Sequence, residues 1–280
     1  MSVIALVVVL QILGLRGAAV KHPRAQRTAL ALPPVTPRKW KGVTQPLGIP
    51  GNWKFALDDE FSGGQLNQAI WRPGWYGTGI TGAPNTLEDD CYSSANVKVA
   101  GDGTMQLAVT ATRSKCHGVT YPYTGALVST NPHDGRRSGG FVYTYGVLEA
   151  RVYVPGKQTW LFDWPAIWTD GFHWPVDGED DVMEAIGGNA CFHFHSLHYA
   201  RHGPGACVIL RPGWHTFASD WSPGSVSYYY DGHRVATITH GITDKPMFIV
   251  IDNTVWRTER ALTHPAVMRV DYVRVWQRVG

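Results

Sequence analysis

The sequence predicts an all-β domain built as a two-sheet sandwich, and three observations support this fold class. Gly (31 residues) and Pro (18 residues) are frequent and charged residues make up only 17% of the 280 residues, which disfavours coiled coils and helical bundles. Several short segments alternate with a period of two, and no long stretch keeps a helical period. The 44% of hydrophobic residues is enough for a sizeable core.

The strands can be placed along the chain from their alternation and turns. In the predicted strand Thr104–Thr112, for example, Met105, Leu107 and Val109 share one face. From Asn52 onward we find no internal repeat and no composition break, so one domain of about 230 residues is expected. The predicted strands are Thr104–Thr112, Gly146–Val154 and Met268–Trp276, and Val226–Thr239 is predicted to be a hairpin that turns at Asp231-Gly232.

The N-terminal region differs from the rest in charge and in composition. Residues 1–48 contain seven Lys or Arg and no acid, so the remaining chain, with 18 basic and 22 acidic residues, has a net charge of −4. A basic face for nucleic acid is therefore not supported. The apolar run Val3–Leu15 is too short to span a bilayer comfortably and suits a signal peptide, with a buried helix as the alternative. We expect a signal peptide over 1–19, a basic Pro-rich linker over 20–48 and the folded domain over 49–280, in a secreted protein without membrane attachment after cleavage.

Four cysteines form an even set, and none belongs to a CxxC pair, which disfavours a structural zinc site. In an exported chain two disulfides are plausible, and buried free thiols are the alternative. Three pairings are possible. We expect the local one, because each pair then brackets one loop-rich excursion: Cys91–Cys116 and Cys191–Cys207.

Glu149 and Arg151 occupy the polar face of the strand Gly146–Val154, whose other face is apolar. Two interpretations remain open. The pair either forms a cross-strand ion pair on an exposed sheet, or it lines a concave, polar ligand cleft.

The strongest chemical signal is a run of four acids in six residues at 179–184. In a regular strand Glu184 would face away from Glu179 and Asp181, but a one-residue bulge at Val182-Met183 would bring all three to one cleft. Crowded carboxylates raise at least one pKa, so that one acid can be a proton donor while another is an ionised nucleophile. Glycoside hydrolysis needs this division of roles.

Three other interpretations of the run compete: a solvated acidic loop, a calcium loop, and a charged edge strand. The tryptophans upstream favour the glycosidase, because their faces stack on sugar rings. These four residues lie within 15 positions: Trp160, Trp164, Trp168 and Trp174. The histidines at 193, 195 and 198 taken alone could suggest a metal site, but packed or hydrogen-bonded histidines are the better interpretation.

An ordered set of motifs resembles glycoside hydrolase family 16, the laminarinase and lichenase clan of jelly rolls with a bulged E-x-D-x-x-E signature. The matches run in the family's order over about residues 52–277. They are LDDEF (Leu57–Phe61), YGVLEARVYVP (Tyr145–Pro155), WPAIW (Trp164–Trp168), GEDDVMEAIGG (Gly178–Gly188), SLHY (Ser196–Tyr199), WHTFASDWSPGSVSYYYDG (Trp214–Gly232) and VDYVRVW (Val270–Trp276).

The resemblance implies a concanavalin A-like β-sandwich jelly roll with a concave substrate cleft. It implies a secreted, retaining endo-glycosidase for β-1,3- or mixed β-1,3/1,4-glucans, a monomer with a polysaccharide substrate and no catalytic cofactor. Glu179 resembles the nucleophile, Glu184 the acid/base and Asp181 the assisting carboxylate. Other implied positions are the cleft aromatics Trp164 and Trp168, the sugar-binding residues Glu149 and Arg151, the histidine beside the acid/base, His198, and a structural calcium site of Asp271 with backbone oxygens near Glu60 and Gly103.

Two departures and several rival functions accompany this resemblance. The family usually has an aliphatic residue where this chain has Asp180, which must be paired, protonated or in a locally different strand. The segment FIVIDNTVW has Asp252-Asn253 in place of the usual Asn-plus-Gly segment. The rivals are a family-16 enzyme for galactan or xyloglucan, a transglycosylase, a non-catalytic glycan-binding jelly roll and a structural metal-binding sandwich.

Overall fold

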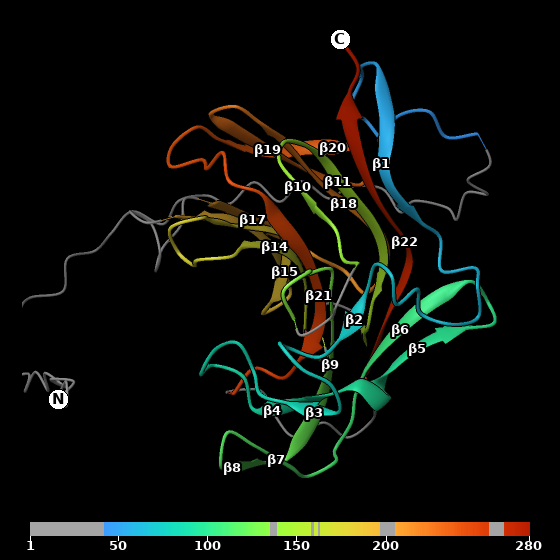
Figure 1. The fold of residues 1–280 in the computed structure, drawn as a ribbon, viewed down its shortest axis with the longest axis vertical. Coiled ribbons are helices and arrows are strands. Elements are labelled where there is room, and N and C mark those ends of the chain that lie inside the picture. The colour runs from blue at the N-terminus through green and yellow to red at the C-terminus, as the bar shows by residue number, and fades with distance from the viewer. Residues whose placement is uncertain (1–41, 135–138, 158–159, 162, 197–204, 258–265) are drawn as a thin grey trace, which may run out of the picture.

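The computed structural model describes residues 42–280 except 135–138, 158–159, 162, 197–204 and 258–265. The signal peptide predicted over 1–19 and most of the predicted linker lie outside these residues. The described part contains no α-helix, only a 3-10 turn at Ser94–Asn96, and none of its helices is long and apolar enough to cross a membrane. Two large twisted sheets face each other, which confirms the sandwich (Figure 1).

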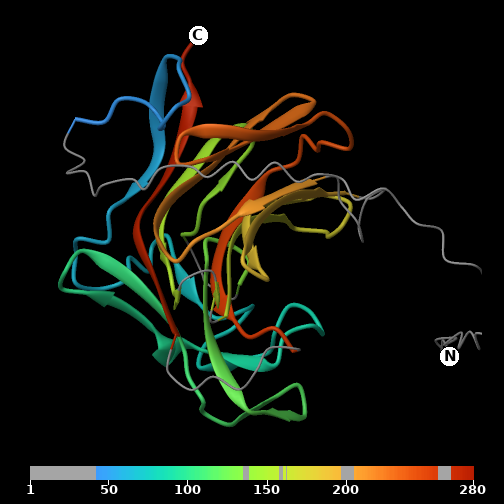
Figure 2. The same cartoon turned by 180° about the vertical axis from the view of Figure 1, so that it is seen from behind.

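The first sheet carries the chain's C-terminal strand near its middle (Figure 2). Its order is β20 (His233–Ile238), β19 (Ser225–Tyr230), β18 (Gly213–Ser222), β11 (Gly146–Val154), β22 (Ala266–Arg278), β6 (Thr104–Val109) and β5 (Val97–Ala100), and β1 (Trp53–Asp59) also pairs with β22.

The second sheet carries the predicted acidic strand, β15. Its order is β17 (Gly205–Ile209), β16 (Asn189–His195), β15 (Glu179–Ile186), β14 (Trp164–Gly171), β21 (Met247–Thr254), β9 (Tyr123–Ser129), β4 (Asp90–Ser93) and β3 (Ile80–Thr81), with β10 (Val142–Tyr143) beside β21 and β2 (Arg72–Pro73) beside β9. Two small hairpins complete the list: β7 (Ser114–Cys116) with β8 (Val119–Tyr121), and β12 (Gly156–Lys157) with β13 (Trp160–Leu161).

The core fills the space between the two sheets and follows the predicted alternation. Met105, Leu107 and Val109 of β6 are fully buried. The predicted hairpin is confirmed as β19 and β20, and its turn residues Asp231 (φ 50°) and Gly232 (φ 79°) both have the positive φ that a two-residue type I′ turn requires.

Both predicted disulfides are present. Cys91 of β4 is bonded to Cys116 of β7, and Cys191 of β16 is bonded to Cys207 of the neighbouring edge strand β17. Each bond joins segments that are close in sequence, 25 and 16 residues apart, as the local pairing predicted. The second disulfide anchors the edge strand to β16, which carries the facing histidines and pairs on its other side with β15, the strand of the acidic run.

The segment just before residue 49 packs on the outer face of the first sheet. The Leu47 N–H donates to the Glu149 carboxylate at 2.5 Å, and Ile49 is buried against Val147 and Trp276. The contacts of the folded domain therefore begin several residues before the predicted boundary at 49, because the outer face of β11 offers an apolar strip and a buried acceptor.

Candidate active site

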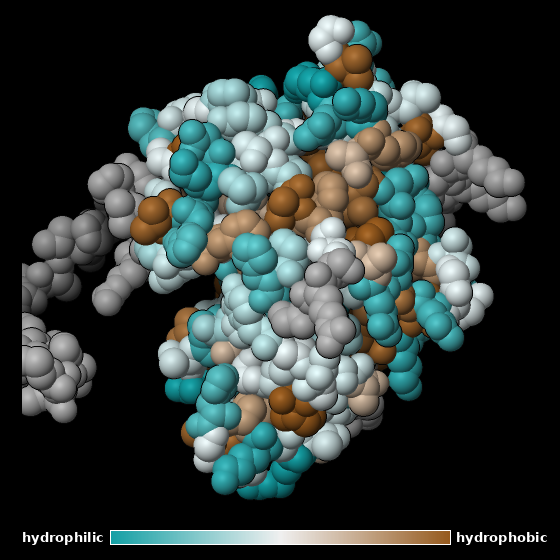
Figure 3. Space-filling model, viewed as in Figure 1, coloured by the Kyte–Doolittle hydropathy of each residue, from teal (hydrophilic) through white to brown (hydrophobic). Residues whose placement is uncertain are grey.

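A cleft of about 390 Å³ lies on the outer, concave face of the second sheet. Its floor is formed by β14, β15 and β21, and its walls include β4 and the loops that carry Trp75 and Trp174. In the space-filling view the left outline of the molecule is notched between these elements (Figure 3). The volume falls within the range of small-molecule sites.

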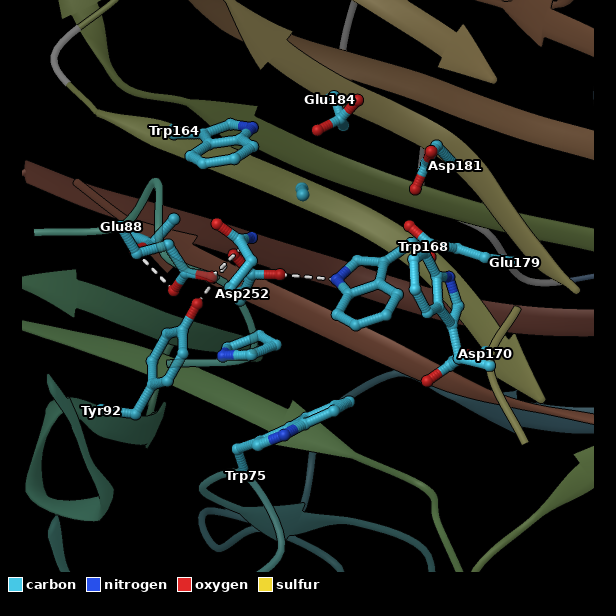
Figure 4. A pocket seen from close by; sticks show the side chains of 15 residues that line it. Trp75, Glu88, Tyr92, Trp164, Trp168, Asp170, Glu179, Asp181, Glu184 and Asp252 are labelled. Atoms are coloured by element: carbon cyan, nitrogen blue, oxygen red, sulfur yellow. Dashed lines mark hydrogen bonds between the residues drawn. The ribbon is translucent and has the colours of Figure 1, made fainter. Parts of the chain in front are cut away.

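The three carboxylates predicted to act together do line this cleft. The register between β15 and its neighbours shifts between Asp181 and Glu184, so that two residues of β15 stand opposite one residue of β16. This is the bulge predicted at Val182-Met183, and both bulge residues are fully buried in the core. Because of the extra residue, Glu179, Asp181 and Glu184 face the same side (Figure 4).

Burial and mutual proximity control the protonation of this trio. Burial raises the pKa of Glu179, while hydrogen bonds from Asp181 and from the Trp174 indole favour its ionised form. Burial and the neighbouring carboxylates Glu179 and Glu184 raise the pKa of Asp181 well above its ordinary value. A proton on Asp181 that is donated to Glu179 satisfies both groups, and Glu179 then keeps the negative charge.

Two histidines of β16 face the trio from the neighbouring strand. His195 Nε2 lies 3.0 Å from Asp181 Oδ2, and His193 Nδ1 lies 3.4 Å from Glu184 Oε2. They alternate with buried Phe194, so both imidazoles lie on the cleft side of β16. The third histidine, His198, lies outside the described residues.

The predicted cleft aromatics Trp164 and Trp168 both line the cleft, with Trp75 opposite (Figure 4). The Trp168 indole N–H donates to Asp252 Oδ1 at 2.7 Å, and its ring lies 5.6 Å from that of Trp75. The Asp252 side chain therefore fixes the orientation of the Trp168 ring in the cleft.

A second group of acids lies at the other end of the cleft and was not predicted. Thr254 Oγ1 lies 3.1 Å from Glu88 Oε2 and 2.5 Å from Asp90 Oδ1, and Tyr92 hydroxyl lies 3.4 Å from Asp252 Oδ2. Burial raises the pKa of Glu88 to about 8 and that of Asp90 to about 6. Burial and the charges of Glu88 and Asp90 raise the pKa of Asp252 well above its ordinary value. Glu88 and Asp252 therefore hold protons at neutral pH, whereas Asp90 is mostly ionised and accepts from the Thr254 hydroxyl.

Asp180 points into the core, opposite to the trio, and bridges the two sheets. Tyr228 hydroxyl lies 2.7 Å from Asp180 Oδ1 and 2.8 Å from the His193 carbonyl oxygen. The hydroxyl has one hydrogen and the carbonyl can only accept, so a protonated Asp180 satisfies both contacts. Burial raises the pKa of Asp180 to about 6, so the protonated arrangement forms as the pH falls to about 6. The sequence analysis required Asp180 to be paired, protonated or in a locally different strand. In the structure it is paired and readily protonated.

The prediction that Glu149 and Arg151 bind sugar is wrong. Both residues belong to β11 in the first sheet, and they lie on its outer face, because Leu148, Ala150 and Val152 fill the core face. Tyr272 hydroxyl and Leu47 N–H donate to Glu149. Arg151 pairs with Asp271 at 2.6 Å and lies 4.5 Å from the centre of the Trp214 ring. Arg151 thus forms a cross-strand ion pair with Asp271 of β22, but Glu149 and Arg151 are both buried, so the exposed sheet of the other interpretation is not what the structure has.

The residues of the predicted calcium site have other partners. Asp271 accepts from Arg151, and Glu60 pairs with Arg274, while Gly103 lies in the turn between β5 and β6 with φ 78°. A calcium ion at the Asp271 side chain would have to displace the Arg151 guanidinium group, whereas the backbone oxygens near Glu60 and Gly103 are not affected by the Glu60–Arg274 pair. The calcium site stays a prediction.

Sequence reasoning missed Trp75, Glu88 and Asp252 as cleft residues. The acids at 88–90 and Asp252 within an apolar strand were visible signals, because a charged residue in a buried strand needs a partner. Trp75 had no such signal, since its loop reaches the cleft only through the pairing of distant segments.

The structure has the fold of the family-16 glycoside hydrolases, the family that its motifs resemble, and its cleft contains the three carboxylates of β15 and several tryptophans. No protein-family model matches the chain. The chain is 27% identical over 264 residues to a beta-glucanase of Rhodothermus marinus, a match that covers 81% of this chain and 86% of the relative.

Solved structures of glucanases have the same fold as this chain. The catalytic domain of an endo-1,3-beta-glucanase (laminarinase) from Thermotoga petrophila superposes with a TM-score of 0.70 at 23% identity, over 82% of this chain and 100% of that chain. A non-specific endo-beta-1,3(4)-glucanase from family GH16 gives a TM-score of 0.68 at 24% identity, over 85% and 98%. The resemblance to family 16 and the jelly-roll fold are thereby confirmed.

Proposed function

We propose that this protein is an exported, retaining endo-β-glucanase that hydrolyses β-1,3- or mixed β-1,3/1,4-glucans. One observation carries the proposal: the bulge in β15 turns Glu179, Asp181 and Glu184 into one tryptophan-lined cleft. A binding module would need the tryptophans but not three converging carboxylates. The glucanase relatives support the choice of substrate.

Glu179 is the nucleophile in this mechanism. Its ionised form receives hydrogen bonds from Asp181 and Trp174, so the charge resides on the group that attacks the anomeric carbon. Attack forms a glycosyl-enzyme and neutralises that charge. Asp181 is protonated at the start and orients Glu179 by donating a hydrogen bond to it. This hydrogen bond changes as Glu179 loses its negative charge.

Glu184 is the acid/base. It is half-buried and lies at the end of the trio farthest along the strand from Glu179. His193 Nδ1 lies 3.4 Å from its carboxylate. It protonates the leaving glycosidic oxygen in the first step and activates water in the second. Retention requires the two catalytic carboxyls to lie about 5–5.5 Å apart, which two residues on one face of a bulged strand can reach.

The charge of the cleft favours a neutral polysaccharide. Six carboxyl groups and no lysine, arginine or histidine occur among the described residues that line it. An anionic polymer would meet only acidic or uncharged groups, so sulfated galactans are poor candidates. The tryptophans offer stacking faces for uncharged glucose rings.

Hydrolysis of a polysaccharide panel tests the proposal. Reducing sugar should appear from laminarin or lichenan and not from carrageenan or agarose, and Asp244→Ala, at an exposed carboxyl, should keep the wild-type rate. Glu179→Ala should nearly abolish hydrolysis, and azide should restore turnover of an activated β-glycoside with an α-glycosyl azide as product. Wild-type rates in both Glu179→Ala and Glu184→Ala would refute the glycosidase assignment.

The rival functions give different outcomes in the same experiment. A glycan-binding jelly roll would be retained by insoluble glucan without releasing reducing sugar. A transglycosylase would convert oligosaccharides into longer products. A galactanase or xyloglucanase would act on another polymer of the panel.

Export is proposed from the N-terminal signal-like sequence and is supported by the two disulfides, which persist in oxidising compartments. The calcium site at Asp271 is retained as a proposal with Arg151 as the competitor of the ion. A calcium-dependent rise in melting temperature that Asp271→Ala removes would support this site. Equal melting temperatures in calcium and in chelator would reject it.

A further inference from the structure

Three ligand-type side chains meet where β15 and β16 pair at the cleft. Asp181, His193 and His195 each offer one ligand atom, and these atoms all lie within 4.8 Å of one another. In the antiparallel register Asp181 stands opposite His193, and His195 stands two residues further along the same strand, on the same face. We propose that these residues form a binding site for a divalent transition-metal ion of the Zn²⁺ type, whose occupancy blocks the cleft.

The donor set selects the metal. Two imidazoles and one carboxylate are a typical three-residue zinc set, with the fourth position left to water. Hard cations such as Mg²⁺ and Ca²⁺ prefer all-oxygen sites, so they should not compete here.

The geometry is close to what such an ion requires. Ligand atoms about 2.1 Å from a tetrahedral ion lie roughly 3.4 Å apart, and Asp181 Oδ2 and His195 Nε2 are already 3.0 Å apart. His193 has to close the remaining gap. Its side chain is 27% exposed, and its ring lies against Gly205, where an added Cβ would come within 2.1 Å of His193 Cδ2. The glycine therefore leaves room for the imidazole beside the site.

An ion can reach this site through the cleft, because Asp181 lines it. Once bound, the ion takes the carboxylate that contacts Glu179, at the point where a sugar ring must approach. Metal and substrate then exclude each other. This last step rests on the proposed glucanase function, whereas binding of the metal does not.

Calorimetric titration of the untagged, disulfide-bonded full chain with ZnCl₂ tests the site. We expect one cleft ion per chain, affinity at least about tenfold weaker in His193→Gln and in His195→Gln, and loss of that ion in the double variant. His233→Gln, an exposed histidine of β20 in the other sheet, is the matched control and should bind as the wild type does. MgCl₂ should give no binding at this site.

Two results would overturn the site: no zinc binding by the wild type, or zinc binding that neither histidine substitution changes. The wild-type titration decides the question even if a variant misfolds, and a visible Co²⁺ spectrum of tetrahedral type gives a second readout of the donor set. For the competition, zinc should raise the apparent KM for laminarin in the wild type and in His233→Gln. If zinc binds but the chain hydrolyses no glycan, the glucanase proposal fails while the metal site stands.

Discussion

Replacing Glu88 by glutamine should remove a loss of stability that the wild-type protein suffers as the pH rises. Burial raises the pKa of Glu88 from 4.5 to about 8. The Thr254 hydroxyl has one hydrogen, which its 2.5 Å contact assigns to Asp90, so protonated Glu88 donates to the Thr254 oxygen. A glutamine amide can donate to Thr254 and accept from Asn85 in the same way, and it cannot ionise.

The sign and size of the effect follow from the two pKa values. A raised carboxyl pKa stabilises the folded protein fully below pH 4.5, and this contribution is lost as the pH rises towards 8. Between these values the folded state holds about one proton more than the unfolded state, so stability falls by about 1.4 kcal/mol per pH unit. The upper limit is roughly 5 kcal/mol, and relaxation around the buried charge should reduce it to about 2–4 kcal/mol.

Urea unfolding at pH 5 and at pH 8 measures this contribution. Glu88→Gln should match the wild type within about 1 kcal/mol at pH 5 and exceed it by about 2–4 kcal/mol at pH 8. Asp244→Asn, at an exposed carboxyl, serves as the control and should follow the wild type. Other buried acids contribute to both proteins, so the difference between them is the quantity that counts. If Glu88→Gln were less stable than the wild type by the same amount at pH 5 and at pH 8, the reasoning would be refuted.

Three further predictions concern the core, the edge strand and the cleft. Tyr228→Phe should lower the free energy of unfolding by about 1–3 kcal/mol, because Asp180 loses its partner; an unchanged urea midpoint would contradict this. Replacing Cys191 and Cys207 by serine should cost about 3 kcal/mol in thermal unfolding, and a cost near zero would mean that β17 is held by other contacts. Trp168→Ala should lower kcat/KM for laminarin about tenfold, and wild-type kinetics would remove this ring from the binding site.

Local patterns were sufficient to predict the strands and the acidic site. The period of two marks the core face of a strand wherever one face is buried, so β6 and β11 could be located from their alternation. The bulge could be inferred because only an extra residue brings Glu184 to the face of Glu179, while Val182 and Met183 supply the apolar residues that the core needs.

Long-range pairing explains what the sequence did not show. Alternation shows that Glu149 and Arg151 share a face, but not which side of the sandwich that face covers, and here the family resemblance misled. Glu88 reaches the cleft because residues far apart in the chain, including Thr254, pack beside it. Such contacts depend on strand order, which local periodicity does not encode.

The bond between Asp180 and Tyr228 makes two distant positions depend on each other during sequence change. An aliphatic residue at 180 alone would leave the Tyr228 hydroxyl with one partner fewer, and phenylalanine at 228 alone would leave a buried acid without the hydroxyl that pairs with it. Each single substitution gives a less stable protein, whereas the two substitutions together give an apolar contact between the sheets. Descendants and relatives of this chain should therefore keep both polar residues or lose both, a covariation that links the strand of the proposed catalytic acids to the opposite sheet.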